Sequence, residues 1–215
     1  SLCQAHDIHP VTLLIVPGRP WLPSQIATLR AWAEEGHVLA GHGWQHCTET
    51  IGGIGHWLHS RLISRNVAEH LAVDEVSIAG LITHCHAWFE QHGLPAPYLY
   101  VPPAWAMGGI SRATLRGLPF SHYETLTGVY DAANDRFQRL PVLGFEADRA
   151  WRAPLLRLSN ALNAARARRR PLRIAIHPHD MHYRLATRLR QWLAAPLYCL
   201  TYTEIGPGNE VTDSR

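Results

Sequence analysis

Apolar positions along this chain fall into two alternating patterns. Short apolar runs of four to six residues predict buried strands at 11–16, 37–40, 98–101, 172–176 and 197–202. Between these runs, apolar residues recur every three or four positions, which predicts helices over 24–35, 61–92, 154–165 and 183–193. Strands that alternate with helices indicate an α/β fold with a mostly parallel sheet, as a closed barrel or an open sheet. We expect one domain over residues 1–205 and a polar tail over 206–215.

Several residues mark where these helices begin and end. Ser24 and Ser111 are expected N-caps, and Asp74 is expected to cap the second half of a long helix that breaks near residue 73. Gly93 is expected to end that helix, and Pro154 to occupy a first helical position. Leucines at the spacing of one helix face then predict an inward stripe at 155, 158 and 162, and the same pattern predicts inward leucines at 185, 189 and 193. Further short strands are expected at 120–123, 125–130 and 140–143.

The beginning of the chain has an unusual order of elements. Residues 1–9 are compatible with the last turns of a helix, and a buried strand follows at once. We therefore expect one strand and most of a helix to precede Ser1 in the natural protein.

Composition narrows the class of protein. Hydrophobic residues make up 47% and charged residues 17%, an ordinary balance for a folded domain. The formal net charge of +3 is too small to indicate nucleic-acid binding, and the arginines of 166–170 are typical of a solvated helix end. No apolar run reaches the roughly 18 residues of a membrane span, and no signal-peptide pattern is seen at residue 1. Four cysteines without a CxxC pair favour reduced thiols in a cytoplasmic protein.

A histidine pair follows the second predicted strand. His42 and His46 lie four residues apart in a glycine-containing loop, and Trp44 stands between them. Neutral imidazole is the commonest metal ligand, and α/β folds bind ligands beyond the carboxyl ends of their strands. The pair therefore predicts a metal site, although spacing alone leaves a structural or surface role open.

Two other strand ends carry polar or aromatic groups of the same kind. Pro103 and Trp105 follow the strand at 98–101, and Trp105 offers a flat apolar surface for a sugar ring. His177 and Asp180 follow the strand at 172–176, where His177 could protonate a leaving group as a general acid. Each also has a structural alternative: a core aromatic for Trp105, a satisfied core histidine for His177 and a helix cap for Asp180.

Taken in order, these motifs resemble a known superfamily. The segments are His42-Gly43-Trp44-Gln45-His46, Val101-Pro102-Pro103-Ala104-Trp105 and Ile174-Ala175-Ile176-His177-Pro178-His179-Asp180. Together they are similar to the polysaccharide deacetylases (NodB-homology, carbohydrate esterase 4-like), and most of all to a divergent branch of deacetylase-like proteins.

The resemblance implies a distorted (β/α) barrel that holds a divalent metal, most often zinc, with cobalt, manganese or nickel as alternatives. It implies that His42 and His46 are metal ligands and that His177 is catalytic. It assigns substrate contacts to Pro103, Trp105, Asp180 and Trp44. The family's first motif is an Asp-Asp pair that supplies a base and a further ligand, and this sequence contains no Asp-Asp. We expect that motif to lie upstream of Ser1, so that this chain forms an incomplete barrel with one exposed edge.

The predicted function is therefore metal-dependent removal of acetyl groups from an N-acetylated or O-acetylated sugar. Two alternatives stay open at this point. One is a catalytically impaired barrel that serves as a carbohydrate-binding or scaffold module, and the other is a metal hydrolase of a different amide or ester. An acetylated glycan is the expected partner, with no nucleic acid and no membrane span, and the sequence does not indicate an oligomeric state.

Overall fold

The computed structural model describes residues 2–45, 70, 73–167 and 170–205, and they divide into two compact units. The larger unit is Val11–Gln138, and the smaller unit combines Ser1–Pro10 with Arg139–Arg215. The chain is of the mixed α/β class, as the sequence predicts. The single domain over 1–205 stays a prediction, and the tail at 206–215 lies outside the described residues. None of the described helices is both long and apolar enough to cross a membrane.

The larger unit is built on a six-stranded sheet with the order β1-β2-β3-β4-β5-β6. Its strands are β1 (Thr12–Ile15), β2 (Val38–Gly41), β3 (Leu99–Tyr100), β4 (His122–Thr125), β5 (Gly128–Asp131) and β6 (Arg136–Arg139). The pairs from β1 to β4 are parallel, whereas β4 and β5 form an antiparallel hairpin. The parallel strands end at the same edge of the sheet, so the loops that follow them share that edge.

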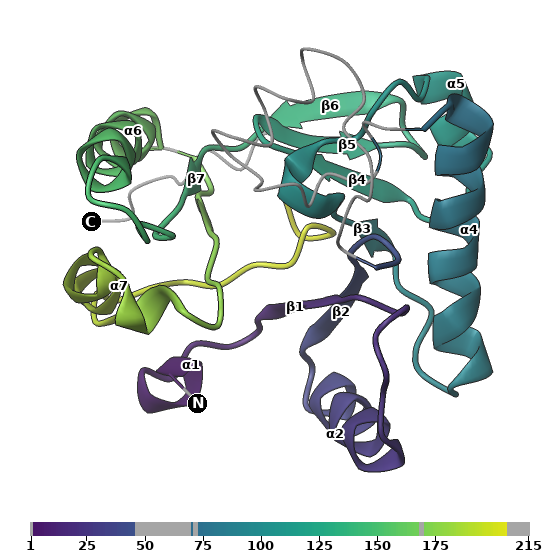
Figure 1. The fold of residues 1–215 in the computed structure, drawn as a ribbon, viewed down its shortest axis with the longest axis horizontal. Coiled ribbons are helices and arrows are strands. Elements are labelled where there is room, and N and C mark those ends of the chain that lie inside the picture. Colours follow the sequence, from purple (N-terminus) through teal and green to yellow (C-terminus); the bar gives the residue numbers. More distant parts are fainter. Residues whose placement is uncertain (1, 46–69, 71–72, 168–169, 206–215) are drawn as a thin grey trace. The chain divides into compact units, whose positions relative to one another are not determined.

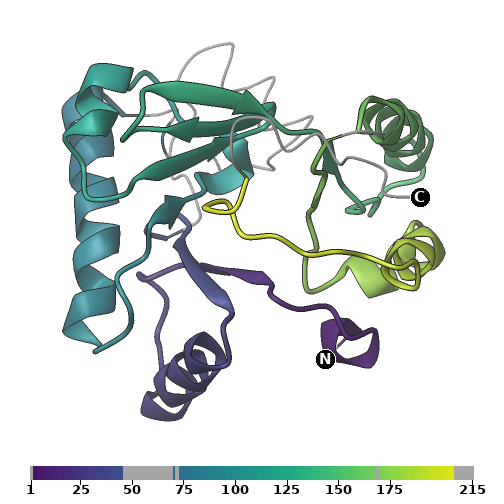
Figure 2. The same cartoon turned by 180° about the vertical axis from the view of Figure 1, so that it is seen from behind.

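Helices cover one face of this sheet. They are α2 (Pro23–Glu34), α4 (Glu75–Gln91) and α5 (Arg112–Arg116), and both ribbon views show α4 beside the strands (Figures 1 and 2). Buried residues of α2, α4 and the strands form one apolar cluster that includes Leu29, Ile82, Phe89, Tyr100 and Tyr123. A short 3-10 turn, η3 (Pro103–Trp105), follows β3 directly.

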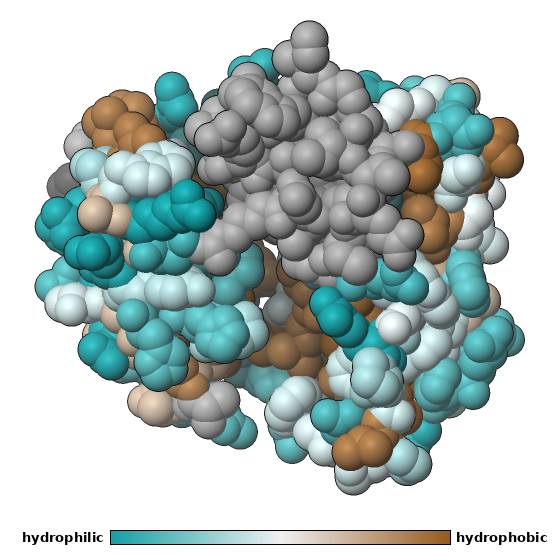
Figure 3. Space-filling view, viewed as in Figure 1, coloured by the Kyte–Doolittle hydropathy of each residue, from teal (hydrophilic) through white to brown (hydrophobic). Residues whose placement is uncertain are grey.

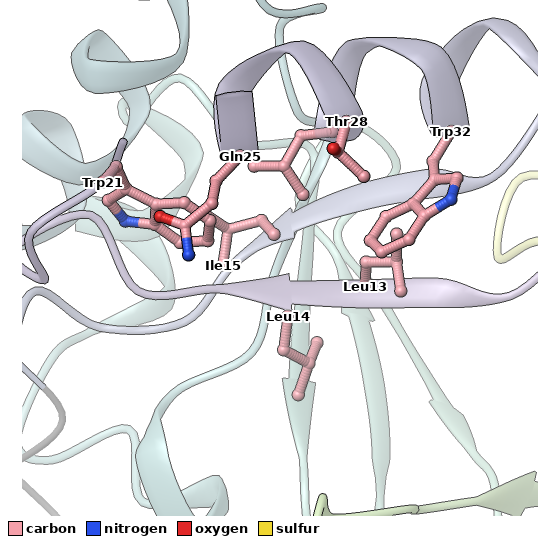
Figure 4. A pocket seen from close by; sticks show the side chains of 8 residues that line it. Leu13, Leu14, Ile15, Trp21, Gln25, Thr28 and Trp32 are labelled. Carbon is pink, nitrogen blue, oxygen red and sulfur yellow. The ribbon is translucent and has the colours of Figure 1, made fainter. Parts of the chain in front are cut away.

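The first strand shows which side chains face these helices. In Figure 4, Leu13 and Ile15 point toward α2, and Leu14 points to the opposite face of the sheet. The groove between α2 and β1 is lined by Leu13, Ile15, Trp21 and Trp32 among others. Within the described residues β1 is the last strand on its side of the sheet, and Leu14 is 44% exposed. The expected exposed edge of a barrel stays a prediction.

Gly41, the last residue of β2, lies where the sheet and α4 approach most closely. An added Cβ would stand 2.8 Å from Cys85 Sγ and 2.9 Å from Phe120 Cζ. Gly41→Ala is therefore expected to lower the free energy of unfolding by about 1–3 kcal/mol, the usual cost of overpacking a core. Gly80→Ala is the matched control, because its Cβ would meet nothing within 4 Å on α4. Chemical denaturation should show Gly80→Ala stabilised by about 0.5–1 kcal/mol, and equal effects of the two variants would contradict the packing argument.

The smaller unit has its own sheet and core. It contains α1 (Leu2–Ala5), β7 (Val142–Leu143), α6 (Arg152–Arg166), β8 (Arg173–Ile174), η4 (Asp180–His182) and α7 (Ala186–Leu193). Strands β7 and β8 are parallel, and the core contains the predicted leucines of α7, which are at most 2% exposed. The inward stripe predicted for α7 is confirmed.

The prediction for α6 was wrong in orientation. Leu155, Leu158 and Leu162 are 58%, 61% and 49% exposed, and Figure 3 shows hydrophobic surface over this helix. The helix turns its asparagines inward instead. Asn160 donates to the Gly144 carbonyl at 2.8 Å, and Asn163 donates to the Val142 carbonyl at 2.9 Å. These bonds to the β7 segment fix the helix rotation and leave the leucines outward.

Other element predictions need correction. The segment 197–202 is not a strand: Glu204 accepts the Thr201 amide at 2.6 Å, which closes a turn, and no described strand pairs with it. Strand β8 is shorter than predicted, and Ile176 is 40% exposed. In α2 the N-cap position is Leu22 and not Ser24, and the Leu22 amide donates to Gln25 Oε1 at 2.9 Å. Helix α6 begins at Arg152, two residues before Pro154. The predicted helix over 61–72 lies almost wholly outside the described residues.

Candidate functional site

His42 is the first residue after β2, at the carboxyl edge of the parallel strands. Its backbone amide donates to the Ile15 carbonyl of β1 at 2.8 Å, so the residue is held in line with the sheet. Its ring Nδ1 lies 2.7 Å from the Val101 carbonyl of the neighbouring chain segment. Because a carbonyl only accepts hydrogen bonds, Nδ1 carries a proton, and in the neutral ring the lone pair is therefore on Nε2. Metal-binding histidines use this arrangement, in which one ring nitrogen donates to a carbonyl and the other binds the ion.

The loop after His42 is packed against the helical face of the sheet. The Trp44 ring stacks on His84 of α4, with ring centroids 3.8 Å apart and planes at 20°. The Trp44 carbonyl accepts the Gly18 amide at 2.7 Å, and a Cβ on Gly18 would lie 2.6 Å from that oxygen. The structure thus gives Trp44 a packing role, and its predicted substrate contact stays a prediction. His46, the second predicted ligand, lies outside the described residues.

The segment after β3 has a strained backbone. Ala104 and Trp105 have φ angles of +53° and +56°, in a backbone region that residues other than glycine adopt rarely. Such a conformation costs of the order of 1–3 kcal/mol per residue and is concentrated at binding and active sites. Pro103 is buried, and Trp105 is partly exposed. The predicted substrate-binding pair therefore lies on a tight turn that surrounding contacts hold in place.

One of those contacts is a buried carboxylate that sequence patterns did not reveal. Glu124 of β4 is only 7% exposed, and its Oε1 accepts the indole Nε1–H of Trp105 at 2.7 Å. A carboxylate is seldom buried, because removing its charge from water is costly. A single glutamate in a short strand has no sequence signal of its own. Its significance depends on knowing which strands are neighbours.

A buried histidine is hydrogen-bonded to a tyrosine of β3. His70 Nε2 lies 2.8 Å from the Tyr100 hydroxyl, and both side chains are fully buried. Burial lowers the pKa of His70 to about 4, so the ring is neutral at ordinary pH. The pair fixes the face of β3 that points toward the helices.

His177 and Asp180 form a second polar group, in the smaller unit. Asp180 is completely buried, and its Oδ2 accepts the His177 amide at 2.8 Å and lies 3.5 Å from His177 Nδ1. The His177 side chain is 46% exposed. The hydrogen bond and charge of Asp180, joined by the charge of Glu146, raise the pKa of His177 above its usual 6.5. A raised pKa extends the pH range in which the His177 ring carries a proton, and a general acid needs that proton.

The predicted residues are thus divided between the two units. His42, Pro103 and Trp105 follow neighbouring strands of the larger unit, whereas His177 and Asp180 belong to the smaller one. Among the described residues no group of three or more His, Cys, Asp or Glu side chains could hold a metal ion. Of the described cysteines, Cys3, Cys85 and Cys199 form no disulfide bond. Comparison of the chain with protein-family models, with characterised proteins and with solved structures found no match.

Proposed function

We propose that this chain is a metal-dependent deacetylase of the polysaccharide deacetylase type, acting on an N-acetylated or O-acetylated sugar. The observation that carries the proposal is the hydrogen bond from His42 Nδ1 to the Val101 carbonyl, 2.7 Å long, at the carboxyl edge of the parallel strands. It gives His42 the tautomer of a metal ligand, and the sequence supplies His46 four residues later. The donor set therefore fits a borderline ion such as zinc.

The metal and the chain would have separate tasks. A bound divalent ion supplies Lewis acidity, which polarises an acyl carbonyl and lowers the pKa of water. His42 and His46 would hold that ion. Trp105 would stack against the apolar face of a sugar ring, and Pro103 would fix the turn that presents it. His177, with its proton held by Asp180, would protonate the leaving nitrogen or oxygen.

We further infer that the two sheets belong to an incomplete (β/α) barrel. Strands β1 to β4 are parallel in sequential order, and β7 and β8 are parallel as well. The residues to which we assign roles follow the carboxyl ends of β2, β3 and β8, which is where (β/α) barrels carry their sites.

A second candidate function is a barrel that binds glycans without turnover. It is favoured by the lack of an Asp-Asp pair in the sequence and of a three-ligand group among the described side chains. The two functions differ in one assay, because a binding module would retain acetylated oligosaccharides on an affinity matrix and release no acetate.

Zinc content tests the proposal directly. We expect His42→Ala combined with His46→Ala to abolish stoichiometric zinc binding and acetate release, because each substitution removes one of the proposed imidazole ligands. His84→Ala is the matched control, since this exposed histidine stacks on Trp44 and has no ligand role in the proposal. Unchanged zinc content in the double variant, measured by atomic emission, would show that the site is elsewhere.

A further inference from the structure

Strand register places a carboxylate at the level of His42. Gly41 of β2 pairs with Tyr100 of β3, and Tyr100 pairs with Tyr123 of β4. The next residue on each segment is therefore His42, Val101 and Glu124, at one level across three neighbouring strands. The Val101 amide donates to the Gly41 carbonyl at 2.9 Å, so the pairing of β2 and β3 continues to this level.

His42 and Glu124 also share a face of the sheet. Tyr100 and Tyr123 point into the apolar cluster beneath α4, and a Cβ on Gly41 would meet Cys85 of that helix. Because successive residues of a strand point to opposite faces, His42 and Glu124 point away from the helices. They stand two strands apart, or about 10 Å between Cα atoms at the usual strand spacing. Two side chains of this length can reach one ion above the strand between them.

The contact with Trp105 orients the Glu124 carboxylate. Oε1 accepts the indole proton at 2.7 Å, and a carboxylate has about four lone-pair directions. The strained turn of Ala104 and Trp105 thus fixes the glutamate as well as the tryptophan.

We propose that Glu124 is the carboxylate ligand of the metal that His42 binds. This inference rests on the metal site of the proposed function and adds to it a ligand from within this chain. Imidazole and carboxylate together form a common zinc donor set. The same glutamate then links the ion to Trp105, so the ligand and the sugar-stacking surface are held by one side chain.

Zinc affinity of purified variants tests the assignment. Glu124→Gln keeps an oxygen that accepts the Trp105 proton but removes the charge, and Trp105→Phe removes the proton donor but keeps the carboxylate. Competition with a chromophoric chelator should show zinc binding weakened by more than about 100-fold in Glu124→Gln, since loss of a ligand's hydrogen-bond partner alone costs about 10–100-fold. Trp105→Phe should lose no more than about 10–100-fold, because it removes only the hydrogen-bond partner of the ligand. With cobalt as the probe, the visible absorption bands should change in Glu124→Gln and persist in Trp105→Phe.

The possible outcomes distinguish failure of this ligand assignment from failure of the proposed function on which it rests. If the unaltered chain binds no zinc, both fail. If His42→Ala loses zinc but Glu124→Gln binds it as tightly as the unaltered chain, only the ligand assignment fails. An equal loss in Glu124→Gln and Trp105→Phe would also overturn it, because the glutamate would then act only by holding the turn. Circular dichroism of each metal-free variant identifies a folded sample.

Discussion

Phe120→Ala is expected to lower the free energy of unfolding of the larger unit by about 3–5 kcal/mol, the range for removing a large buried aromatic ring. Phe120 is 2% exposed and lies just before β4. Its ring centroid is 5.2 Å from that of Tyr100 and 5.0 Å from that of His86 on α4. The ring therefore fills the space where the sheet and the helix meet, directly under Gly41. Its loss removes both the buried apolar area and these two ring contacts.

Val76→Ala is the control for this change. Val76 is on α4, the helix that Phe120 contacts, but is 80% exposed, so its truncation should alter stability by no more than about 0.5 kcal/mol. Urea unfolding followed by circular dichroism measures both. A loss below about 1 kcal/mol for Phe120→Ala would show that the packing described between β4 and α4 is wrong.

Signals that act over three or four residues could be predicted from the sequence. Asp74 caps α4 by accepting the Ser77 amide at 2.8 Å, and Ser111 caps α5 by accepting the Thr114 amide at 3.1 Å. Gly93 follows the C-cap residue of α4 and has a φ of +59°, which ends the helix. The two caps depend only on a side chain and the backbone amide three residues further on. The helix end at Gly93 depends only on the conformational freedom of one glycine. Short stretches of sequence therefore specify all three features.

Features that depend on tertiary partners could not be predicted in the same way. The leucines of α6 have the spacing of a core stripe, but Asn160 and Asn163 bond to the backbone beside β7 and turn the leucines outward. The segment 197–202 has the composition of a strand, yet a strand needs a neighbour, and none of the described strands pairs with it. Periodicity identifies a face without saying which partner will cover it.

The candidate site shows the same division. The histidine loop could be located from its spacing after an apolar run, and the structure places His42 at the predicted strand end. Glu124 could not, because its proximity to His42 follows from the register of three strands far apart in sequence. Trp105 was selected for its ring, whereas its hydrogen bond and positive φ emerge only in the folded chain.

His177→Gln is expected to reduce deacetylase turnover by about 10²–10⁴-fold, the usual contribution of a positioned general acid, while zinc content stays unchanged. Glutamine retains a polar side chain of similar reach but cannot release a proton near neutral pH. The measurement is acetate release from an acetylated oligosaccharide alongside metal analysis. Full turnover in this variant would remove His177 from the reaction.

The proton on His177 can be tested without any substrate through Asp180→Asn. Asparagine still accepts the His177 amide but loses the charge, so the pKa of His177 should fall toward or below 6.5 in an NMR titration of the imidazole. Glu146→Gln should lower this pKa less, because Glu146 acts through its charge alone and not through a hydrogen bond.

The raised pKa of His177 also sets the sign of its effect on stability as the pH changes. The attraction between protonated His177 and Asp180 stabilises the fold fully below pH 6.5, and it is lost as pH rises through the folded-state pKa of His177. Asp180→Asn should abolish that loss, and an unchanged titration of His177 in this variant would contradict the pairing.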